Sequence, residues 1–456
     1  MINKFYQNSN IEKFIIIIFP LLLITGPALP DITAVLLSIY FLLFKIKKNF
    51  KQIINSYWII SFIAVWLWFL IISFFAYNQI TSFSDGIIFF RFIIFTVAIY
   101  FIFSEIDFKF LKILFYISLL IFLFVTLDTL FQFYNYDSAL GFKGDIFGIK
   151  PEGLEGRLSG PFKDLIPGAY LSRFYFLILL IFFIDHSLNK KINNKIILFF
   201  ILFLSLATIY FTGERMAISI ALFSFGIVIL FIKNHKIYFF SLILISFVFI
   251  FINTIFHSHY NNYTIIDSTA KHEGLLIQKK FPCPENKNEI CYKEVSRQPK
   301  FTDVLFNFKD SAYGSIYLTS FKMWVDYPIT GIGLNNFNLV CKNENKYLKY
   351  SKDVGCTTHP HNLYIQALVE TGIIGLLLFI NLVCAIFYKI LLTKNYNVKI
   401  FGFVIILTIF WPIMSTGSFL KNWNMIFISF LIGLTMALCE FASTKKSEFK
   451  NTNFIL

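Results

Sequence analysis

Long apolar runs separated by short polar gaps occupy most of the chain. The runs are continuous and lack the apolar–polar alternation of membrane strands, so they predict helices. Many approach the roughly 20 apolar residues with which a helix crosses a bilayer, and together they predict about twelve spans. The second run is short and could be tilted or partly re-entrant. The expected spans are 14–30, 31–44, 57–76, 86–104, 110–131, 166–184, 196–212, 216–232, 237–256, 363–388, 399–417 and 423–440.

Lysines in the gaps predict how these helices are oriented. They follow the second, sixth and eighth runs, precede the fifth, separate the tenth from the eleventh, and close the chain. Basic loops stay on the cytoplasmic side, so both termini are expected inside. The chain then divides into residues 1–256 with helices 1–9 and an outer loop at 132–165, a large periplasmic loop at 257–362, and residues 363–456 with helices 10–12 and a cytoplasmic tail.

Composition supports an all-α polytopic membrane protein. The chain is 57% hydrophobic and only 14% charged, with a mean hydropathy of +0.70, whereas soluble domains are about 25% charged. The net charge of +14 could indicate a nucleic-acid partner. We exclude nucleic acid, because the lysines lie mostly between the apolar runs, and expect membrane lipids instead. The first run lacks a small-residue cleavage site and is interpreted as a span rather than a signal peptide.

Four of the six cysteines lie in the large outer loop, where an oxidising space favours disulfides. They are Cys283, Cys291, Cys341 and Cys356. Nearest neighbours in sequence predict the pairs Cys283–Cys291 and Cys341–Cys356, although other pairings stay open. Zinc is disfavoured because the C-x2-C spacing of zinc sites is missing.

The candidate chemistry begins where the chain returns from the large loop into the tenth span, at His359-Pro360-His361-Asn362. A neutral imidazole at this boundary can accept a proton from a sugar hydroxyl. The alternative is that His361 caps or anchors the helix. Glu370 lies nine residues further along the same helix, about two and a half turns away, so it should point away from His361 and fix the helix end.

Several motifs resemble those of bacterial O-antigen ligases and the related O-antigen polymerases. His361-Asn362 followed by Gly372-x2-Gly375 carries the resemblance most specifically. Similar elements are DYPITGIG at 326–333 with Phe337, RLSGPF at 157–162 and TGER at 212–215. The chain departs from the family at Ser219, where a Leu is common, and at Tyr313, where an Arg is common.

The resemblance implies that a glycan on undecaprenyl pyrophosphate passes to an acceptor hydroxyl, such as a lipid A-core sugar, at the periplasmic face of the bacterial inner membrane. His361 would be the base, and arginines would hold the departing pyrophosphate, so no metal or cofactor is expected. Arginine binds phosphate through a planar fork that keeps its charge. The substrate-binding candidates are Arg157, Arg215, Arg91, Arg173, His359 and Asn362.

Arginine use adds a second argument. Only five of the 40 basic residues are arginines, and on this topology all five fall in outer loops or outer halves of spans. Orientation alone would place them inside. We hypothesise that Arg157 and Arg215, with Arg91 or Arg173, converge near His361. Asp128 or Glu214 would hold one of the arginines in place, and for Asp128 a structural ion pair with an arginine is expected. The fifth arginine, Arg297, has a simpler interpretation as a solvated loop residue.

Other functions stay open. An O-antigen polymerase or a protein O-oligosaccharyltransferase would use similar chemistry with another acceptor. A transporter of lipid-linked glycans is the alternative from another class, but transporters place polar residues near the bilayer midplane, whereas here they gather at the outer ends of spans. We find no nucleotide loop and no Asp-x-Asp pair, so a sugar nucleotide is not expected as the donor.

Overall fold

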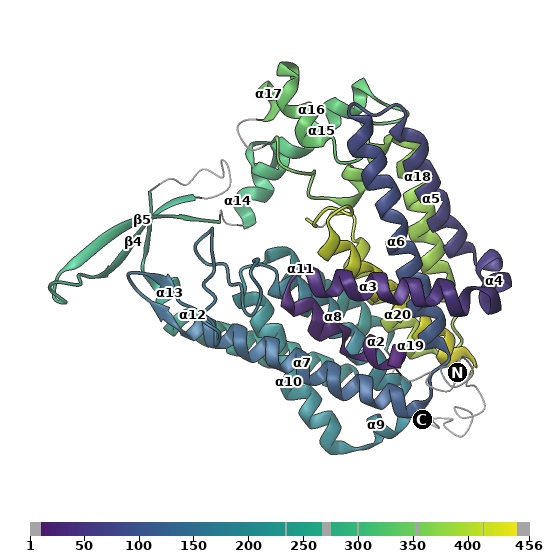
Figure 1. Cartoon of the computed structure of the whole chain (residues 1–456). Coiled ribbons are helices and arrows are strands. Elements are labelled where there is room, and N and C mark those ends of the chain that lie inside the picture. The colour runs from purple at the N-terminus through teal and green to yellow at the C-terminus, as the bar shows by residue number, and fades with distance from the viewer. Residues whose placement is uncertain are drawn as a thin grey trace.

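The computed structural model describes residues 11–232, 235–266, 275–298, 301–351, 355–413 and 415–444. Lysines predicted to mark the cytoplasmic side at Lys233 and at Lys445, Lys446 and Lys450 lie outside these ranges. The described residues form a bundle of apolar helices with two outer loop regions at one end (Figure 1).

Eight helical segments among the described residues are long and apolar enough to cross a membrane, and three further apolar helices are shorter. With α2 they match the expected spans, so the prediction of an all-α polytopic membrane protein is confirmed. The segments are α2 (Ile11–Leu22), α3 (Ala28–Tyr40) continuing into α4 (Ile46–Asn55), α5 (Tyr57–Ser73), α6 (Gln79–Ser104), α7 (Phe108–Tyr134), α8 (Pro167–Ile184), α10 (Ile192–Phe211), α11 (Arg215–Phe231), α12 (Lys236–Phe256), α18 (Leu363–Leu391), α19 (Tyr396–Phe410) and α20 (Asn422–Thr444).

The second span is longer than its apolar run predicts. A π-helical turn at Phe41–Lys45 joins α3 to α4, so one helix extends from Ala28 to Asn55 over 28 residues. The apolar run ends at Phe44 because α4 carries lysines and polar residues, but the helical backbone continues through it. The expectation of a short second helix is therefore wrong. The eleventh helix instead ends early, at Phe410, just before Trp411-Pro412, where the residue preceding proline is extended.

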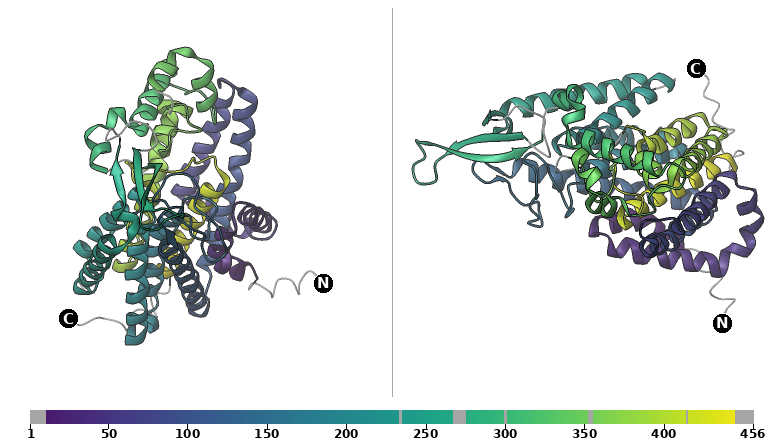
Figure 2. Two further views of the ribbon diagram at one scale, coloured as in Figure 1. Left: turned by 90° about the vertical axis from the view of Figure 1, so that its left-hand side faces the viewer. Right: turned by 90° about the horizontal axis from the view of Figure 1, so that it is seen from above.

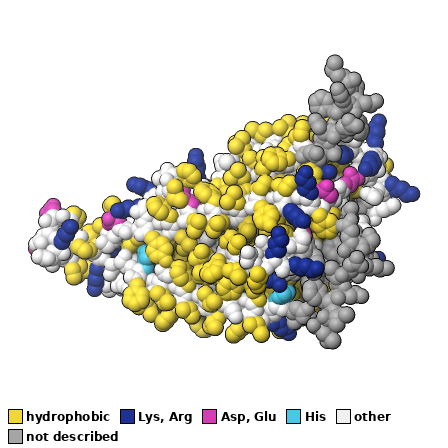
Figure 3. Space-filling view, turned by 90° about the horizontal axis from the view of Figure 1, so that it is seen from below, with side chains coloured by type: hydrophobic (Ala, Val, Ile, Leu, Met, Phe, Trp, Pro, Cys, Tyr) yellow, Lys and Arg dark blue, Asp and Glu magenta, His cyan; other side chains and the backbone are white. Residues whose placement is uncertain are grey.

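The centre and the edge of the bundle differ in burial. In the most apolar stretches of α8 and α20, 89% and 94% of the residues are buried, so these two helices form the middle of the bundle. In α12 only 22% is buried, and large apolar side chains such as Phe240, Leu244 and Phe251 are exposed. Figure 3 shows one molecular face covered by such side chains. This surface suits a lipid solvent.

The outer region combines small sheets with short helices. Strands β3 (Tyr263–Ile265), β4 (Leu275–Pro282) and β5 (Ile290–Arg297) form an antiparallel sheet, and the β4–β5 hairpin projects away from the helices (Figures 1 and 2). Strands β1 (Tyr136–Asp137) and β2 (Gly141–Phe142) pair within the first outer loop. The short helices of this region are α13 (Ser258–Asn261), α14 (Phe301–Phe306), α15 (Ala312–Asp326), α16 (Phe337–Asn343) and α17 (Asn345–Ser351), whereas α9 (His186–Lys190) lies between α8 and α10 away from them.

Helix α18 is broken at Gly372, where φ is 69° and ψ is −175°. The segment 328–333 fills the break. The backbone N–H groups of Ile332 and Gly333 donate to the carbonyls of Val369 and Glu370, both at 3.0 Å, and the N–H of Ile373 donates to Pro328. Backbone groups in a membrane must be bonded within the protein. The segment DYPITGIG at 326–333 and the Gly372-x2-Gly375 motif therefore bond to each other, and we call this contact the joint.

A substitution at Gly372 should open this joint. Its backbone conformation is open essentially to glycine alone, and a Cβ there would collide with the carbonyl of Ile329. We expect Gly372→Ala to reduce stability by on the order of 1–3 kcal/mol or more, seen as a lower midpoint of thermal unfolding in detergent. Gly226→Ala is the matched control, because a Cβ at that helical position meets nothing within 4 Å. Equal midpoints for the two variants would contradict this description of the joint.

Candidate active site

His361 lies at the junction between the outer region and α18, in a left-handed backbone conformation with φ of 54°. The helix cap is its neighbour Asn362, whose side-chain oxygen accepts hydrogen bonds from the N–H groups of Tyr364 and Ile365. The alternative that His361 itself caps the helix is therefore wrong. The amide nitrogen of Asn362 donates to Pro412 at 2.6 Å, so its polar groups hold the junction in place.

His359 lies beside His361, with ring centroids 4.1 Å apart and the ring planes tilted by 41°. It is buried, and its two ring nitrogens lie 2.9 Å from the Thr358 hydroxyl and 3.3 Å from the Thr416 carbonyl. Burial lowers the pKa of His359 to about 3, so this ring is neutral. The predicted substrate contacts of His359 and Asn362 are revised to a positioning role, because their polar atoms are already engaged in the fold.

The imidazole of His361 is partly buried, and among the described residues no hydrogen bond to its nitrogens is found. Burial first, and then the Lys421 ammonium, lower the pKa of His361 below its usual 6.5. The ring is therefore in its neutral form near pH 7, as a base must be.

Tyr313 connects His361 with Arg215. Its ring lies edge-on to the His361 ring at 6.2 Å, and its hydroxyl accepts a hydrogen bond from Ser415 at 2.9 Å. The same phenol lies within electrostatic range of Arg215. Tyr313 is 37% exposed, so it borders the open side of the site. Tyr313 therefore lies near both His361 and Arg215.

Arg157 and Arg215 come together through the turn between α10 and α11. The N–H of Leu158 donates to the Thr212 carbonyl at 3.2 Å. Gly213 has φ of 73°, and a Cβ there would lie 3.2 Å from Arg157 Cδ and would collide with the carbonyl of Gly156. The two guanidinium groups are close enough to repel each other. The structure therefore brings both predicted arginines to the same region, and Tyr313 links that region to His361.

Glu214 connects the turn between α10 and α11 to the start of α8. Its carboxylate accepts hydrogen bonds from the N–H groups of Gly168 and Ala169, in the first turn of α8, at 2.7 and 3.1 Å. A helix N-terminus favours such an anion. The carboxylate also attracts Arg157 and Arg173. Glu214 therefore fits the predicted role of holding an arginine in place.

Three other predicted residues have partners within the fold. Arg91 forms an ion pair with Asp31 at 2.9 Å and a hydrogen bond with Asn422, so its guanidinium is engaged by the protein. Arg173 is buried between α8 and α20, with its guanidinium 5.6 Å from the ring centre of Phe427. Among the described residues, no contact of either arginine with His361 is found. The ion pair expected for Asp128 is wrong, because its carboxylate accepts a hydrogen bond from the N–H of Ile146 and has no arginine partner among the described residues.

Glu370 is bonded within its own helix and to the segment that fills the break. Its carboxylate accepts a hydrogen bond from Gln366 at 3.0 Å, and Gln366 also donates to Ser418. The backbone carbonyl of Glu370 belongs to the joint with Gly333. Its contacts are therefore those of a residue that holds the broken helix.

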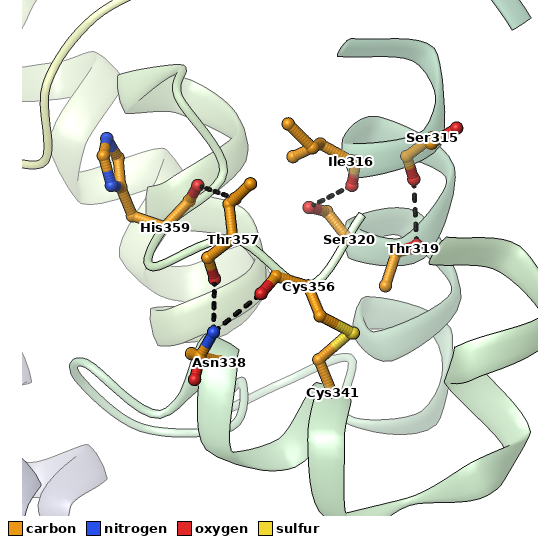
Figure 4. Close-up of a disulfide and its surroundings, with 9 residues drawn as sticks. All are labelled: Ser315, Ile316, Thr319, Ser320, Asn338, Cys341, Cys356, Thr357 and His359. Carbon is orange, nitrogen blue, oxygen red and sulfur yellow. Dashed lines mark hydrogen bonds between the residues drawn. A yellow bond between two sulfur atoms is a disulfide. The ribbon is translucent and has the colours of Figure 1, made fainter. Parts of the chain in front are cut away.

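A disulfide holds the segment before His361. The structure joins Cys341 to Cys356 and Cys283 to Cys291, the pairs of nearest neighbours expected from the sequence. Figure 4 shows the hydrogen bonds that connect the Cys341–Cys356 disulfide to His359. Asn338 donates to the carbonyls of Cys356 and Thr357, and the Thr357 hydroxyl donates to the His359 carbonyl. The outer helix α16 is thus tied to the histidine segment.

Known families provide an independent comparison. The family model for O-antigen ligase matches residues 200–380. This region is similar to the O-antigen ligase family. The matched range contains Arg215, Tyr313 and His361, while Arg157 precedes it. No curated protein matches the chain. The family supports glycosyl transfer of the O-antigen ligase or polymerase type, in lipopolysaccharide biosynthesis, by a multi-pass membrane protein.

Sequence reasoning missed two residues near the histidines and a third beside Arg215. Lys421, at the start of α20, gave no signal, because its proximity to His361 arises only from folding. Tyr313 was noticed only as a departure from the family. Arg297 was set aside as solvated, yet it lines a cavity with Arg215. Within the described residues, no three metal-ligating side chains gather into one group.

The Cys341–Cys356 bond should matter for the site as well as for the fold. Closing a loop of 15 residues contributes up to about 3 kcal/mol in the chain-entropy model. We expect replacement of both cysteines by Ser to lower the midpoint of thermal unfolding and to reduce glycan transfer, because the His359 segment loses its tether.

Replacement of Cys283 and Cys291 by Ser is the matched control, since that bond closes the distant hairpin. We expect transfer by this control to stay near normal. Transfer that falls equally in both double variants would show that the tether does not act through the histidine segment.

Proposed function

We propose that this protein transfers a glycan from undecaprenyl pyrophosphate to an acceptor hydroxyl, such as a lipid A-core sugar, at the periplasmic face of the bacterial inner membrane. The observation that carries the proposal is the line of groups from Arg157 through Arg215 and Tyr313 to His361. It joins two cations to a neutral base at the outer end of the helices. The chemistry is that of the general family reaction.

His361 removes the proton from the acceptor hydroxyl. The acceptor oxygen then attacks the anomeric carbon of the donor, the bond from that carbon to the pyrophosphate oxygen breaks, and undecaprenyl pyrophosphate leaves with the bonding electrons. Arg215 and Arg157 stabilise the charge that grows on the leaving group. Lys421 adds a third cation beside the base. The Arg157 guanidinium is positioned by a hydrogen bond from Nη2 to the Leu165 carbonyl at 2.7 Å, and its Nε has no partner among the described atoms. The captured proton passes from His361 to water.

The donor lipid has an apolar path next to this site. A groove of about 760 Å³ lies between α15 and α18, lined by Phe308, Leu318, Phe321 and Ile365. Tyr317, from the same wall, lies 6.3 Å from the Tyr313 ring. A polyprenyl chain in this groove would bring its pyrophosphate toward Tyr313 and Arg215.

A transporter is less consistent with the structure. Transporters also use broken helices, but the freed backbone groups there coordinate the substrate. At the break in α18 the carbonyls of Val369 and Glu370 are bonded by the loop, and the Thr371 carbonyl accepts from Trp68 Nε1 at 2.9 Å. These groups are therefore not available to a substrate.

Replacement of His361 tests the proposal. His361→Ala should abolish transfer from the lipid-linked donor, by on the order of 10²-fold or more, while leaving the protein inserted and folded. His359→Ala is the neighbouring control and should cost less, because its ring only positions the base. The measurement is transfer by purified protein in a bilayer. Near-normal transfer by the His361 variant would refute the role of the base.

Two substitutions of Arg215 distinguish the contribution of its planar hydrogen-bonding geometry from that of its charge. Arg215→Lys keeps a cation but loses the planar, two-pronged donor. We expect this variant to recover little of the transfer rate that Arg215→Gln loses. Arg91→Lys is the comparison, because Arg91 is already paired with Asp31 within the fold, and its replacement should leave the rate nearly unchanged. Full recovery by Arg215→Lys would show that charge alone suffices.

The pH dependence follows from the lowered pKa of His361. The neutral form acts, so the rate should decline as pH falls, with the midpoint of this acid limb below pH 6.5. Lys421→Gln removes a charge that disfavours the protonated ring, so the acid limb should move to higher pH. Lys342→Gln, an exposed lysine of α16, should leave it in place. An acid limb that Lys421→Gln does not move would contradict this assignment.

A further inference from the structure

A cavity of about 380 Å³ lies beside Arg215, among β3–β5, α11 and the first outer loop. Its volume is in the range of about 300–1,000 Å³ typical of small-molecule sites. Three tyrosines line it, Tyr210, Tyr260 and Tyr263, together with Ile265 and Ile277. Aromatic side chains offer flat apolar faces with a polar edge. Such walls suit a ring that has apolar C–H faces and hydroxyl edges, as a sugar has.

The cavity is also cationic. Arg297, at the end of β5, lies over the Tyr263 ring with its guanidinium 4.5 Å from the ring centre. Arg215 enters from the other side, and its Nε donates to Gln298 at 3.2 Å. Among the described residues, neither arginine has a carboxylate within ion-pair distance. Two guanidinium groups therefore face one cavity without an acidic partner.

The one carboxylate in the lining, Glu155, is already engaged. It lies 3.4 Å from the Lys279 ammonium and accepts a hydrogen bond from the Tyr263 hydroxyl at 3.1 Å. The backbone N–H of Glu155 donates to the Ser296 carbonyl at 2.9 Å, next to Arg297. The first outer loop thereby fixes the strand end that carries Arg297. Arg297 is held over the cavity by the Tyr263 ring and by the bond between Glu155 and Ser296, so it is not the solvated loop residue expected from the sequence.

We propose that this cavity binds the sugar next to the donor pyrophosphate and selects a sugar that carries a carboxylate. The inference rests on the proposed function, because Arg215 is shared between the pyrophosphate and the cavity. The sugar ring packs on the tyrosines, and its carboxylate binds the edge of the Arg297 guanidinium, whose face is covered by Tyr263. An Arg–carboxylate pair of this kind is bidentate and directional.

The test compares two donors in equilibrium binding to the full chain in lipid nanodiscs. The probes are undecaprenyl pyrophosphate linked to glucuronic acid and the same lipid linked to glucose. We expect the glucuronic acid donor to bind about tenfold more tightly, as one charged hydrogen-bonded pair permits. Arg297→Gln should remove this preference and leave binding of the glucose donor within about twofold. Arg297→Lys should retain part of it. Lys293→Gln, an exposed lysine of the same strand, is the control and should change neither.

Two results would overturn the proposal. Equal binding of both donors by the unmodified protein would remove the selectivity for a carboxylate. Equal weakening of both donors by Arg297→Gln would assign Arg297 to the pyrophosphate instead. Because binding is measured without turnover, the preference should persist in the His361→Ala background. If the unmodified protein shows the preference but transfers no glycan from either donor, the proposed function fails and the sugar subsite stands.

Discussion

The structure depends on one constraint: a helix cannot break inside a bilayer unless other groups bond the backbone atoms that the break exposes. At Gly372 the segment 328–333 supplies those bonds. That segment follows α15 directly and leads into α16. The joint therefore fixes where the outer helices sit on the bundle. Tyr313, in the first turn of α15, reaches the His361 ring because of it.

A second joint brings the cations. Gly213 lets the first outer loop pack onto the turn between α10 and α11, and Glu214 ties that turn to the start of α8. Arg157 and Arg215 are thereby held close together in spite of their repulsion. The motifs that resemble the O-antigen ligase family are thus mostly joints of the fold, and the chemically active side chains project from them. This explains why glycine and proline are as prominent in these motifs as charged residues.

Much of the fold could be predicted from the sequence, because the apolar runs determine where helices can lie in lipid. The length of the second helix could not, since α4 is too polar to be recognised as part of a span. The approach of Arg157 to Arg215 could be predicted from the resemblance and from the sparing use of arginine, and their convergence on His361 stays a prediction. The partner of Arg91 could not be predicted, because Asp31 lies 60 residues away. Lys421 and Arg297 join their sites only through tertiary packing.

The most direct measurement of the central claim is the balance of products. Purified protein in a bilayer would receive an undecaprenyl-pyrophosphate-linked glycan and lipid A-core as acceptor, with a chelator present. We predict that one undecaprenyl pyrophosphate is released for each glycan attached to the core. A glycan that stays on its lipid and grows longer, or a transfer that releases undecaprenyl monophosphate, would contradict the proposed reaction.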